Sequence, residues 1–396
     1  MLSKKALNIK PSPTMAIDGK AKEMKSQGLD VIGFGAGEPD FDTPLHIREA
    51  AIDAINNGHT RYTAAAGTVE LKEAICSKFK RENGLTYTPA QIVVSNGAKH
   101  SLDNVFCALL DPGDEVLIPA PFWVSYPEMV KLNDGIPVIL ETNEENRFKV
   151  ELEMLKKACS PKTKALVLNN PSNPTGQLYP AEDLKEIGEF CVANNIFIIS
   201  DEVYEKLVYG GNSCVSIATF SEAIKEQTIV VNAVSKTYAM TGWRIGYTAS
   251  GPEIAAAMAA IQSQTTSNPN AIAQKAAEQA LSGPQDSVAE MLKAFDERRL
   301  FMYEKINSIE GLSALEPLGA FYLFANMSGT VGKKFEGKEI KNSDDFASLL
   351  LESKLVALVP GTGFGAPMHI RLSFATSLNN IKEGLDRVNA FVEELA

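Results

Sequence analysis

The sequence predicts an α/β fold in which a large domain with a doubly wound, mostly parallel sheet is followed by a smaller α+β domain. Between about Gln91 and Ser250, short apolar runs alternate with segments of helix length; the runs are QIVVSN, EVLIP, IPVILE, KALVLNN, IFIISDE, TIVVNAVS and RIGYTAS. Strands that are apolar throughout and separated by helices suit a parallel sheet covered on both faces.

The pattern changes after Gly283 and Pro284. A long charged helix, VAEMLKAFDERRLFMYEKINSI, precedes the strand-like runs GAFYLFAN, LVALVPG and HIRLSFA, a helix near Phe346 and a terminal helix. The opening residues are rich in Pro and Gly and too few for a domain of their own. We therefore expect an N-terminal segment over 1–45 that packs on the small domain, a large domain over 46–284 and a small C-terminal domain over 285–396.

The overall composition excludes several classes of protein. The chain has 396 residues, 45% of them hydrophobic and 22% charged, and its formal net charge of -11 argues against nucleic acid and anionic membranes as partners. No run approaches the roughly 20 apolar residues of a membrane span. The five cysteines are widely spaced without a C-x-x-C pair, which indicates neither a disulfide framework nor a zinc site. We expect a cytoplasmic protein without a bound metal.

The glycine-rich segments do not match a dinucleotide-binding fingerprint. In VIGFGAGEPD, Glu38 stands where the third glycine is required, and GTGFGA is followed by Pro367 and a strand instead of a helix. A simple nucleotide-binding protein is therefore disfavoured.

Polar residues follow several of the predicted strands. After QIVVSN, the turn at Gly97 leads directly into a helix, whose first N–H groups can bind an anion, although such joints are common without a ligand. Asn173 follows KALVLNN, where a plain Asx-Pro turn is the simpler explanation. Asp201 ends IFIISDE at the edge where open α/β sheets bind ligands, but it also suits the cap of the next helix.

Cationic and aromatic side chains accompany them. TIVVNAVS leads into Lys236 and, shortly afterwards, Arg244. Arg371 in HIRLSFA lies on the face opposite the apolar residues, which a solvated strand face would explain equally well. Trp123 follows EVLIP and is either a packing residue or a stacking surface. Because most of these residues fall at the carboxyl ends of successive strands, one ligand can contact them together.

In order along the chain, these segments resemble the pyridoxal-phosphate-dependent aminotransferases of fold type I, class I/II, and among them the bacterial-type aspartate aminotransferases. The resemblance runs nearly end to end, through AGEPDFDTP, TRYTAAAG, NGAKHSL, PAPFWVSYPEM, NPSNPTG, SDEVYE, SKTYAMTGWRIGY, GAFY and HIRLSFA. It implies that the large domain binds pyridoxal 5'-phosphate and that the protein is a homodimer with shared active sites.

The resemblance also implies a role for each residue at the cofactor, with Lys236, Asp201 and Tyr204 as catalytic residues. Lys236 matches the lysine that bonds to the cofactor aldehyde, and a cation such as Arg244 nearby lowers the pKa of that amine. Asp201 matches the acid that pairs with the pyridine nitrogen. The remaining matches are Arg244, Ser235, Gly97, Ala98 and Lys99 at the phosphate, Tyr204 and Asn173 at the ring oxygen, Trp123 on the ring, and Tyr62 at the phosphate of the neighbouring subunit's cofactor.

Further matches concern the substrate. Arg371 matches the arginine that holds the α-carboxylate in a two-bond fork, a geometry that lysine cannot copy. The neighbouring groups implied at the substrate are Asn173, Trp123 and the backbone of Gly37. Lys99 stands where this subgroup carries a lysine near the side-chain carboxylate, which predicts an acidic substrate. Phe122 replaces a tyrosine found in many relatives, a change we expect to be minor.

The expected reaction moves the amino group of aspartate to 2-oxoglutarate. Prephenate, alone or beside aspartate, stays open as a substrate because Lys99 suits either acid. An aromatic aminotransferase or a carbon–sulfur lyase would keep the same cofactor residues, although Lys99 weighs against both. A noncatalytic regulator of this fold is disfavoured, because such proteins resemble a DNA-binding domain fused to an aminotransferase-like one and no such domain is expected before this core.

Overall fold

A computed structural model describes residues 2–9 and 13–396, and its largest element is a seven-stranded sheet. The strand order is β2-β8-β7-β6-β5-β3-β4, and only β8 runs antiparallel to its neighbours. The strands are β2 (Ile92–Ser95), β3 (Glu115–Ala120), β4 (Ile136–Glu141), β5 (Thr163–Asn169), β6 (Phe197–Asp201), β7 (Thr228–Ala233) and β8 (Gly246–Ala249). Every apolar run between Gln91 and Ser250 that was predicted to be a strand is one.

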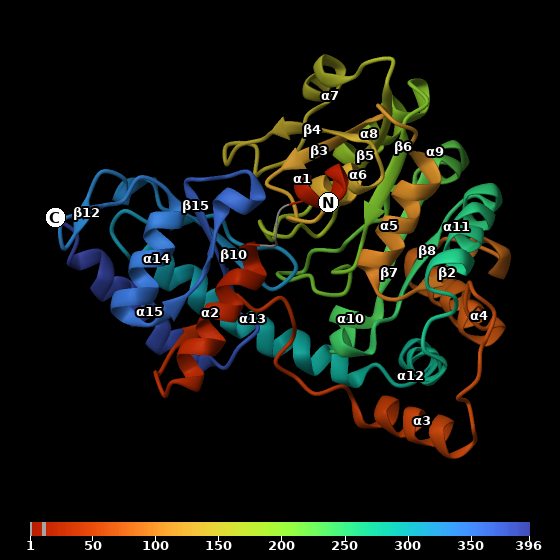
Figure 1. Cartoon of the computed structure of the whole chain (residues 1–396), viewed down its shortest axis with the longest axis horizontal. Coiled ribbons are helices and arrows are strands. Elements are labelled where there is room, and N and C mark those ends of the chain that lie inside the picture. The colour runs from red at the N-terminus through yellow and green to blue at the C-terminus, as the bar shows by residue number, and fades with distance from the viewer. Residues whose placement is uncertain (1, 10–12) are drawn as a thin grey trace.

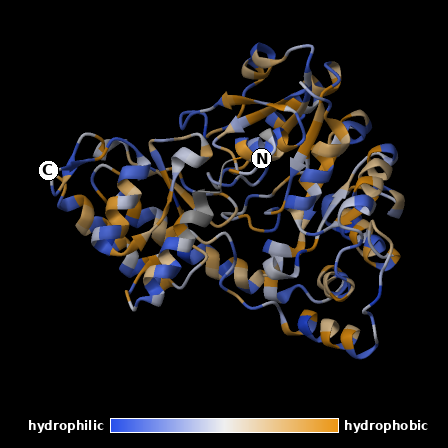
Figure 2. Cartoon of the chain, viewed as in Figure 1, coloured by the Kyte–Doolittle hydropathy of each residue, from blue (hydrophilic) through white to orange (hydrophobic). Residues whose placement is uncertain are grey.

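Helices cover both faces of this sheet. Neighbouring residues of a strand point to opposite faces, so Val116 and Ile118 pack on one helical layer while Leu117 packs on the other. One layer consists of α5 (Ala98–Leu109), α6 (Tyr126–Leu132) and α11 (Pro252–Thr265). The other consists of α3 (Leu45–Asn56), α4 (Val69–Lys78), α7 (Leu152–Ala158), α8 (Ala181–Ala193), α9 (Glu222–Gln227) and α12 (Ala271–Ser282). Figure 2 shows the hydrophobic strands between these layers.

The C-terminal part forms a second core around a four-stranded antiparallel sheet of order β14-β15-β10-β9. Figure 1 shows it beside the large sheet, with the long helix α13 running between the two halves. The elements are α13 (Asp286–Asn307), β9 (Ser313–Ala314), β10 (Tyr322–Asn326), β11 (Lys334–Phe335), β12 (Lys338–Glu339), α14 (Ser343–Lys354), β13 (Val356–Ala357), β14 (Val359–Pro360), β15 (His369–Ser373) and α15 (Leu378–Glu393). The predicted strand LVALVPG is therefore two short strands, β13 and β14, that join different sheets.

The N-terminal segment contacts the C-terminal half. β1 (Ile32–Gly33) pairs in parallel with β13, and Ala21 of α2 (Pro13–Ser26) packs with Leu351 and Ala357. The short helix α1 (Lys4–Asn8) instead lies against the large sheet's half, where Lys5 pairs with Asp134 at 3.0 Å. Part of the segment, α2 and β1, therefore contacts the C-terminal half, whereas α1 contacts the other half, and the division of the chain at 45 and 284 stays a prediction. Among the described residues, no helix is long and apolar enough to cross a membrane.

Candidate active site

A cavity of about 420 Å³ lies at the carboxyl ends of the parallel strands, between the large sheet and the C-terminal half. It brings together most of the residues that the sequence singled out. The predicted residues that line it are Gly37, Ala98, Lys99, Trp123, Asn173, Asp201, Tyr204, Ser235, Lys236, Arg244 and Arg371.

Lys236 lies in the short helix α10 (Val234–Thr237), which begins where the buried strand β7 ends. Its Nζ donates a hydrogen bond of 2.5 Å to the carbonyl oxygen of Gly37. Burial lowers the pKa of this amine to about 8; Glu38 opposes the shift, while Arg244 and Arg371 add to it. About a tenth of Lys236 is therefore unprotonated at pH 7, far more than of an ordinary lysine, and the unprotonated form is the one that acts as a nucleophile or a base.

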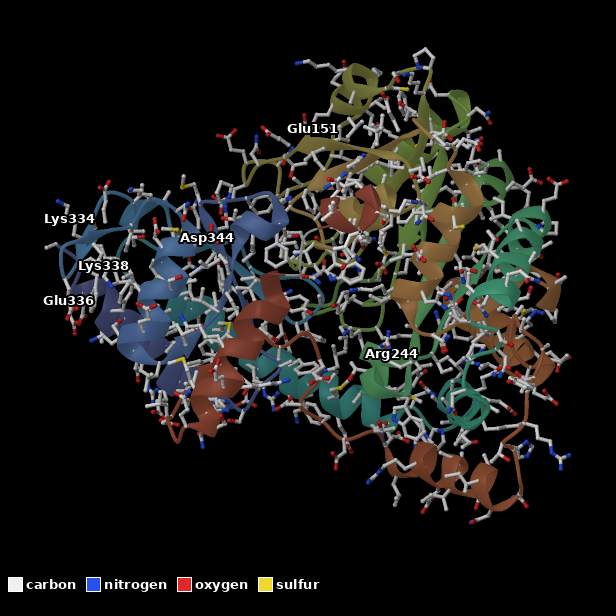
Figure 3. The ribbon with its side chains drawn as sticks, in the orientation of Figure 1. Glu151, Arg244, Lys334, Glu336, Lys338 and Asp344 are labelled. Atoms are coloured by element: carbon white, nitrogen blue, oxygen red, sulfur yellow. The ribbon has the colours of Figure 1, made fainter. Side chains whose placement is uncertain are left out.

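The start of α5 and the side chain of Arg244 form one concave surface. Gly97 precedes the helix with a φ of 87°, and a Cβ at this position would lie 2.3 Å from Nη2 of Arg244. The guanidinium is held by two backbone carbonyls, those of Thr241 at 3.0 Å and Asn96 at 3.3 Å. Figure 3 shows Arg244 beside the green α10, in the half of the molecule that holds the large sheet. Free helix N–H groups next to a guanidinium form an anion site.

Asp201 is buried at the end of β6, where it accepts a hydrogen bond of 2.6 Å from the hydroxyl of Tyr126. Burial raises the pKa of its carboxyl to about 6, against the opposing effects of Tyr126, the N–H of Val203 and the charge of Lys236. The bond from Val203 is long, at 3.3 Å, so Asp201 is held mainly by the phenol. Burial deprives this carboxylate of its hydration. A cationic or N–H group bound inside the cavity would compensate for that loss.

Arg371 enters the cavity from β15 in the C-terminal half. Its side chain is only 3% exposed, so the alternative of a solvated strand face is wrong. It donates to Oδ1 of Asn173 at 3.0 Å and to the carbonyl of Gly35 at 2.9 Å, and its guanidinium lies 4.3 Å from the ring centre of Tyr322. Its buried Nε has no hydrogen-bond partner among the described residues. A donor left in this state fits a site for a carboxylate ligand.

Three further predicted residues complete the walls. The hydroxyl of Tyr204 lies 3.0 Å from that of Tyr322, and burial raises the pKa of Tyr204 well above its usual value. Trp123 lies in the loop after β3, and Nζ of the exposed Lys99 is 4.9 Å from its ring centre. Partial desolvation of its amine, and then the charge of Arg244, lower the pKa of Lys99. Lys99 is thus a cation at the open side of the cavity.

Tyr62 does not line this cavity. Its side chain is 91% exposed, in a surface groove beside Ser267 and Asn270. Gly97 lies behind Arg244 and shapes the cavity without lining it. No group of three or more His, Cys, Asp or Glu side chains suited to a metal ion occurs in the described ranges.

The structure adds residues that the sequence analysis missed. Tyr126 and Tyr322 lie inside the quoted segments PAPFWVSYPEM and GAFY, but no periodicity marks a tyrosine that reaches a distant carboxylate or arginine. Asn169, the last residue of β5, accepts from the N–H of Asn173 at 2.7 Å and donates to the carbonyl of Asp201 at 3.0 Å. A polar residue that ends an apolar strand was the available signal for Asn169.

The family model of class I and II aminotransferases matches residues 29–388. The chain belongs to the class I and II aminotransferase family. This aminotransferase is 51% identical to the aspartate aminotransferase of Geobacillus stearothermophilus over 395 residues, which cover 100% of both chains. It is 48% identical to the aspartate/prephenate aminotransferase of Nitrosomonas europaea over 390 residues, which cover 98% of both chains.

Solved structures of this fold resemble the aminotransferase along its whole length. The aspartate aminotransferase of Rhizobium meliloti has a TM-score of 0.97 and 44% identity, with 100% of both chains covered. That of Thermus thermophilus with maleate has a TM-score of 0.93 and 42% identity, with 99% of both chains covered. The predicted family and fold class, a doubly wound large domain with a smaller α+β domain, are therefore confirmed, as is the prediction of an aminotransferase.

Proposed function

We propose that the protein transfers the amino group of aspartate to 2-oxoglutarate with pyridoxal 5'-phosphate as its cofactor. The observation that carries the proposal is that three groups meet in one cavity. They are a lysine with a lowered pKa, a buried aspartate and a buried arginine. Lys236 and Asp201 come from the large sheet and Arg371 from the C-terminal half, so cofactor and substrate are held from opposite sides.

The residues present fit the cofactor. The surface of Arg244, Ser235 and the α5 backbone from Gly97 to Lys99 matches a phosphate, and only a glycine at 97 leaves room for the guanidinium. Asp201 would face the pyridine nitrogen and favour its protonated form, and burial of the carboxylate would strengthen that ion pair. The donors to the ring oxygen are Tyr204 and Asn173, and Trp123 is the stacking surface. The bound cofactor supplies an aldehyde for Lys236 and a ring that accepts electrons from the substrate carbon.

Lys236 then carries out the proton transfers. With the cofactor bound, the Nζ of Lys236 would take the proton from the substrate Cα and would later give it back as a general acid. A pKa near 8 places the amine close to the working pH, which is the condition for both accepting and donating a proton. The carbonyl of Gly37, 2.5 Å from Nζ, orients the amine toward the cavity.

The substrate is oriented by the cationic groups of the cavity. Arg371 binds the α-carboxylate through a planar fork, with Asn173 and the backbone of Gly37 beside it. Lys99 lies within the same cavity and pairs with the distal carboxylate of the substrate. The binding of maleate, a dicarboxylate, by the Thermus thermophilus neighbour supports a diacid here.

Prephenate is the second candidate substrate. Relatives named aspartate/prephenate aminotransferase are 48% identical to this chain, in Nitrosomonas europaea, and 46% identical, in Cereibacter sphaeroides. Prephenate carries two carboxylates, so the pair of Arg371 and Lys99 can accommodate it.

We propose a homodimer located in the cytoplasm. Tyr62 is exposed and does not line the cavity of its own chain, which supports a role at the cofactor phosphate of a second subunit. The division into a segment over 1–45, a cofactor-binding domain over 46–284 and a small domain over 285–396 belongs to the same proposal. Separate contacts of Ile32 and Asp30 with the C-terminal half support the first boundary.

The decisive experiment combines cofactor mapping with substrate profiling. Borohydride reduction of the purified, loaded enzyme followed by peptide mapping should place the cofactor on Lys236, and Lys236→Ala should keep cofactor binding but lose turnover. Lys225→Ala, which changes a lysine outside the cavity, is the control. Rates with aspartate, prephenate, phenylalanine and methionine then rank the substrates. A cofactor on another lysine, or turnover of the uncharged amino acids alone, would contradict the proposal.

A further inference from the structure

Side chains at the end of β6 and in the turn after it point in two directions. Asp201 and Tyr204 line the active-site cavity, whereas Glu202 and Glu205 are buried on the other side of the same turn. The carboxylate of Glu202 accepts hydrogen bonds from Ser200 of β6 and from Ser216, which follows 14 residues later. Glu205 instead contacts side chains from other elements, so it can fix the turn relative to the rest of the protein.

Glu205 lies at the centre of a buried polar cluster. Its side chain is 7% exposed, and Nζ of Lys78, whose side chain is 3% exposed, contacts Oε1 directly. Asn83 donates to Oε2 at 2.8 Å, and Asn232 donates to Oε1 at 2.8 Å. Burial raises the pKa of Glu205, but Lys78 and the two amides lower it further, to a value below that of an ordinary glutamate. Glu205 is thus a charged, fully bonded anchor.

Asn232 connects this anchor to the strand that carries the lysine. It is 1% exposed in β7, four residues before Lys236, and its own Oδ1 accepts from the N–H of Ala233 at 2.7 Å. The parallel ladder between β6 and β7 ends at the pair Asp201 and Val231, with one more bond from the N–H of Glu202 to the carbonyl of Val231. Beyond this point the bond between Asn232 and Glu205 joins the two segments by side chains.

The cluster is better explained by a role in holding catalytic groups in place than by a contribution to the stability of the fold. A buried ion pair contributes little net stability over well-packed apolar residues, because both charges lose their hydration. Catalytic groups must be held within fractions of an ångström to keep their rate. The cluster joins the turn that carries Asp201 and Tyr204 to the strand that leads to Lys236, which is where such precision is needed.

We propose that Glu205 is a positioning residue that fixes Asp201 and Tyr204 relative to Lys236 through its bond to Asn232, with Lys78 neutralising its charge. The proposal rests on the proposed cofactor roles of Asp201, Tyr204 and Lys236. It concerns how these groups are held and not what they do.

The test separates position from charge. Asn232→Leu removes the bond to β7 but leaves Lys78 and Glu205 paired. We expect a roughly ten- to hundredfold loss of kcat with KM for aspartate changed by no more than about twofold, because Arg371 is untouched. In the apoprotein, the pH midpoint for labelling of Lys236 by an amine-reactive reagent should also move. If Asn232→Leu does not fold, Asn232→Ser removes the same bond with a smaller polar side chain.

Substitutions at both Lys78 and Glu205 test whether kcat can be recovered when the charge of Glu205 is removed. Lys78→Met alone leaves a buried, unpaired carboxylate and should impair both folding and kcat. Adding Glu205→Gln removes the charge but keeps an acceptor for Asn232, so the double variant should recover kcat to within about threefold of wild type. Glu316→Gln, which breaks the pair with the buried Arg299 in the C-terminal half, is the matched control and should change stability alone.

The outcomes are distinct. If Asn232→Leu lowers the melting temperature as Glu316→Gln does, but leaves kcat and the Lys236 labelling midpoint unchanged, the cluster is structural and the proposal is wrong. If the double variant stays as impaired as Lys78→Met, charge rather than position is essential, which also overturns it. Failure of the proposed function would appear differently, as wild-type protein that neither loads the cofactor nor turns over an amino acid.

Discussion

The phenol of Tyr126 donates a hydrogen bond of 2.6 Å to Oδ2 of the buried Asp201, across 75 positions of sequence. It joins the start of α6 to the end of β6 and is the shortest side-chain bond that the aspartate makes. Because burial raises the pKa of this carboxyl and the bond from Tyr126 lowers it, the phenol contributes to keeping Asp201 ionised.

Tyr126→Phe should therefore raise the pKa of Asp201 and lower kcat. Loss of a hydrogen bond to a charged acceptor costs about 1.5–3 kcal/mol, which corresponds to roughly a ten- to hundredfold change in the ionised fraction or rate. The acidic limb of the pH profile of kcat should move to higher pH. Tyr179→Phe, at a tyrosine outside the cavity, is the control. If the acidic limb of the pH profile of kcat does not move in Tyr126→Phe, the phenol only packs against Asp201 and does not influence its ionisation.

Asp201 should also make the apoprotein less stable at neutral pH. Its folded-state pKa of about 6 lies above the ordinary value of 3.8, so the folded chain binds the proton more tightly than the unfolded chain does. The free energy of unfolding should then fall as the pH rises from about 4 to about 6, and stay lower above that. Asp201→Asn removes the charge, so it should stabilise the apoprotein at pH 8 by about 2–3 kcal/mol relative to pH 4.

Denaturant unfolding of both apoproteins at the two pH values measures this difference. Asp53→Asn, at an exposed aspartate of α3, is the control. A gain from Asp201→Asn that does not depend on pH would mean that the carboxyl is already neutral in the folded apoprotein. The loaded enzyme should show the reverse order, because Asp201→Asn loses the charge that faces the ring nitrogen.

Glu38 and Arg244 should shift the pKa of Lys236 in opposite directions. Glu38 raises this pKa and Arg244 lowers it, around a value near 8 that burial establishes. Glu38→Gln should therefore lower the pH midpoint at which Lys236 of the apoprotein reacts with an amine reagent, and Arg244→Gln should raise it. Peptide mass spectrometry quantifies the label at this lysine alone. Shifts of the same sign in both variants would contradict the electrostatic account.

The sequence predicted the framework of this site better than its interior. The strands β3, β5, β6 and β7 are apolar on both faces, so their ends, and with them Asn173, Asp201 and Lys236, followed from composition and turn signals. The alternative for Arg371 failed because alternation in β15 identifies two faces but not what covers them. In the structure the cavity wall and the ring of Tyr322 cover the second face.

Contacts between residues far apart in the chain could not be predicted from sequence patterns. Tyr126 reaches Asp201, and Asn232 reaches Glu205, only because the sheet order places β3, β5, β6 and β7 side by side. Family resemblance supplied the roles of Lys236 and Arg244, whereas spacing alone showed two cations near a strand end. The resemblance gave no signal for a buried glutamate on the reverse side of the turn.

Gly97 should be required for anion binding and not for folding of the sheet. A methyl group at this position would lie 2.3 Å from Nη2 and 2.7 Å from Cζ of Arg244, and the φ of 87° adds backbone strain. Gly97→Ala should displace the guanidinium and weaken binding of pyridoxal phosphate, measured by titration of the apoprotein, while pyridoxal without its phosphate is affected less. Gly58→Ala, at a φ of 74° with open space around it, controls for the strain alone.

Lys99 tests the choice of substrate. Its Nζ lies over Trp123 at the open side of the cavity and is the cation available to a distal carboxylate, since Arg244 faces the α5 turn and Arg371 holds Asn173. Lys99→Ser should lower kcat/KM for aspartate, glutamate and prephenate by roughly ten- to a hundredfold, because an ion-paired hydrogen bond of about 1.5–3 kcal/mol is lost. Phenylalanine and alanine should be nearly unaffected. If Lys99 instead serves the cofactor phosphate, cofactor affinity falls and all substrates lose alike, and such an equal loss would exclude the dicarboxylate role.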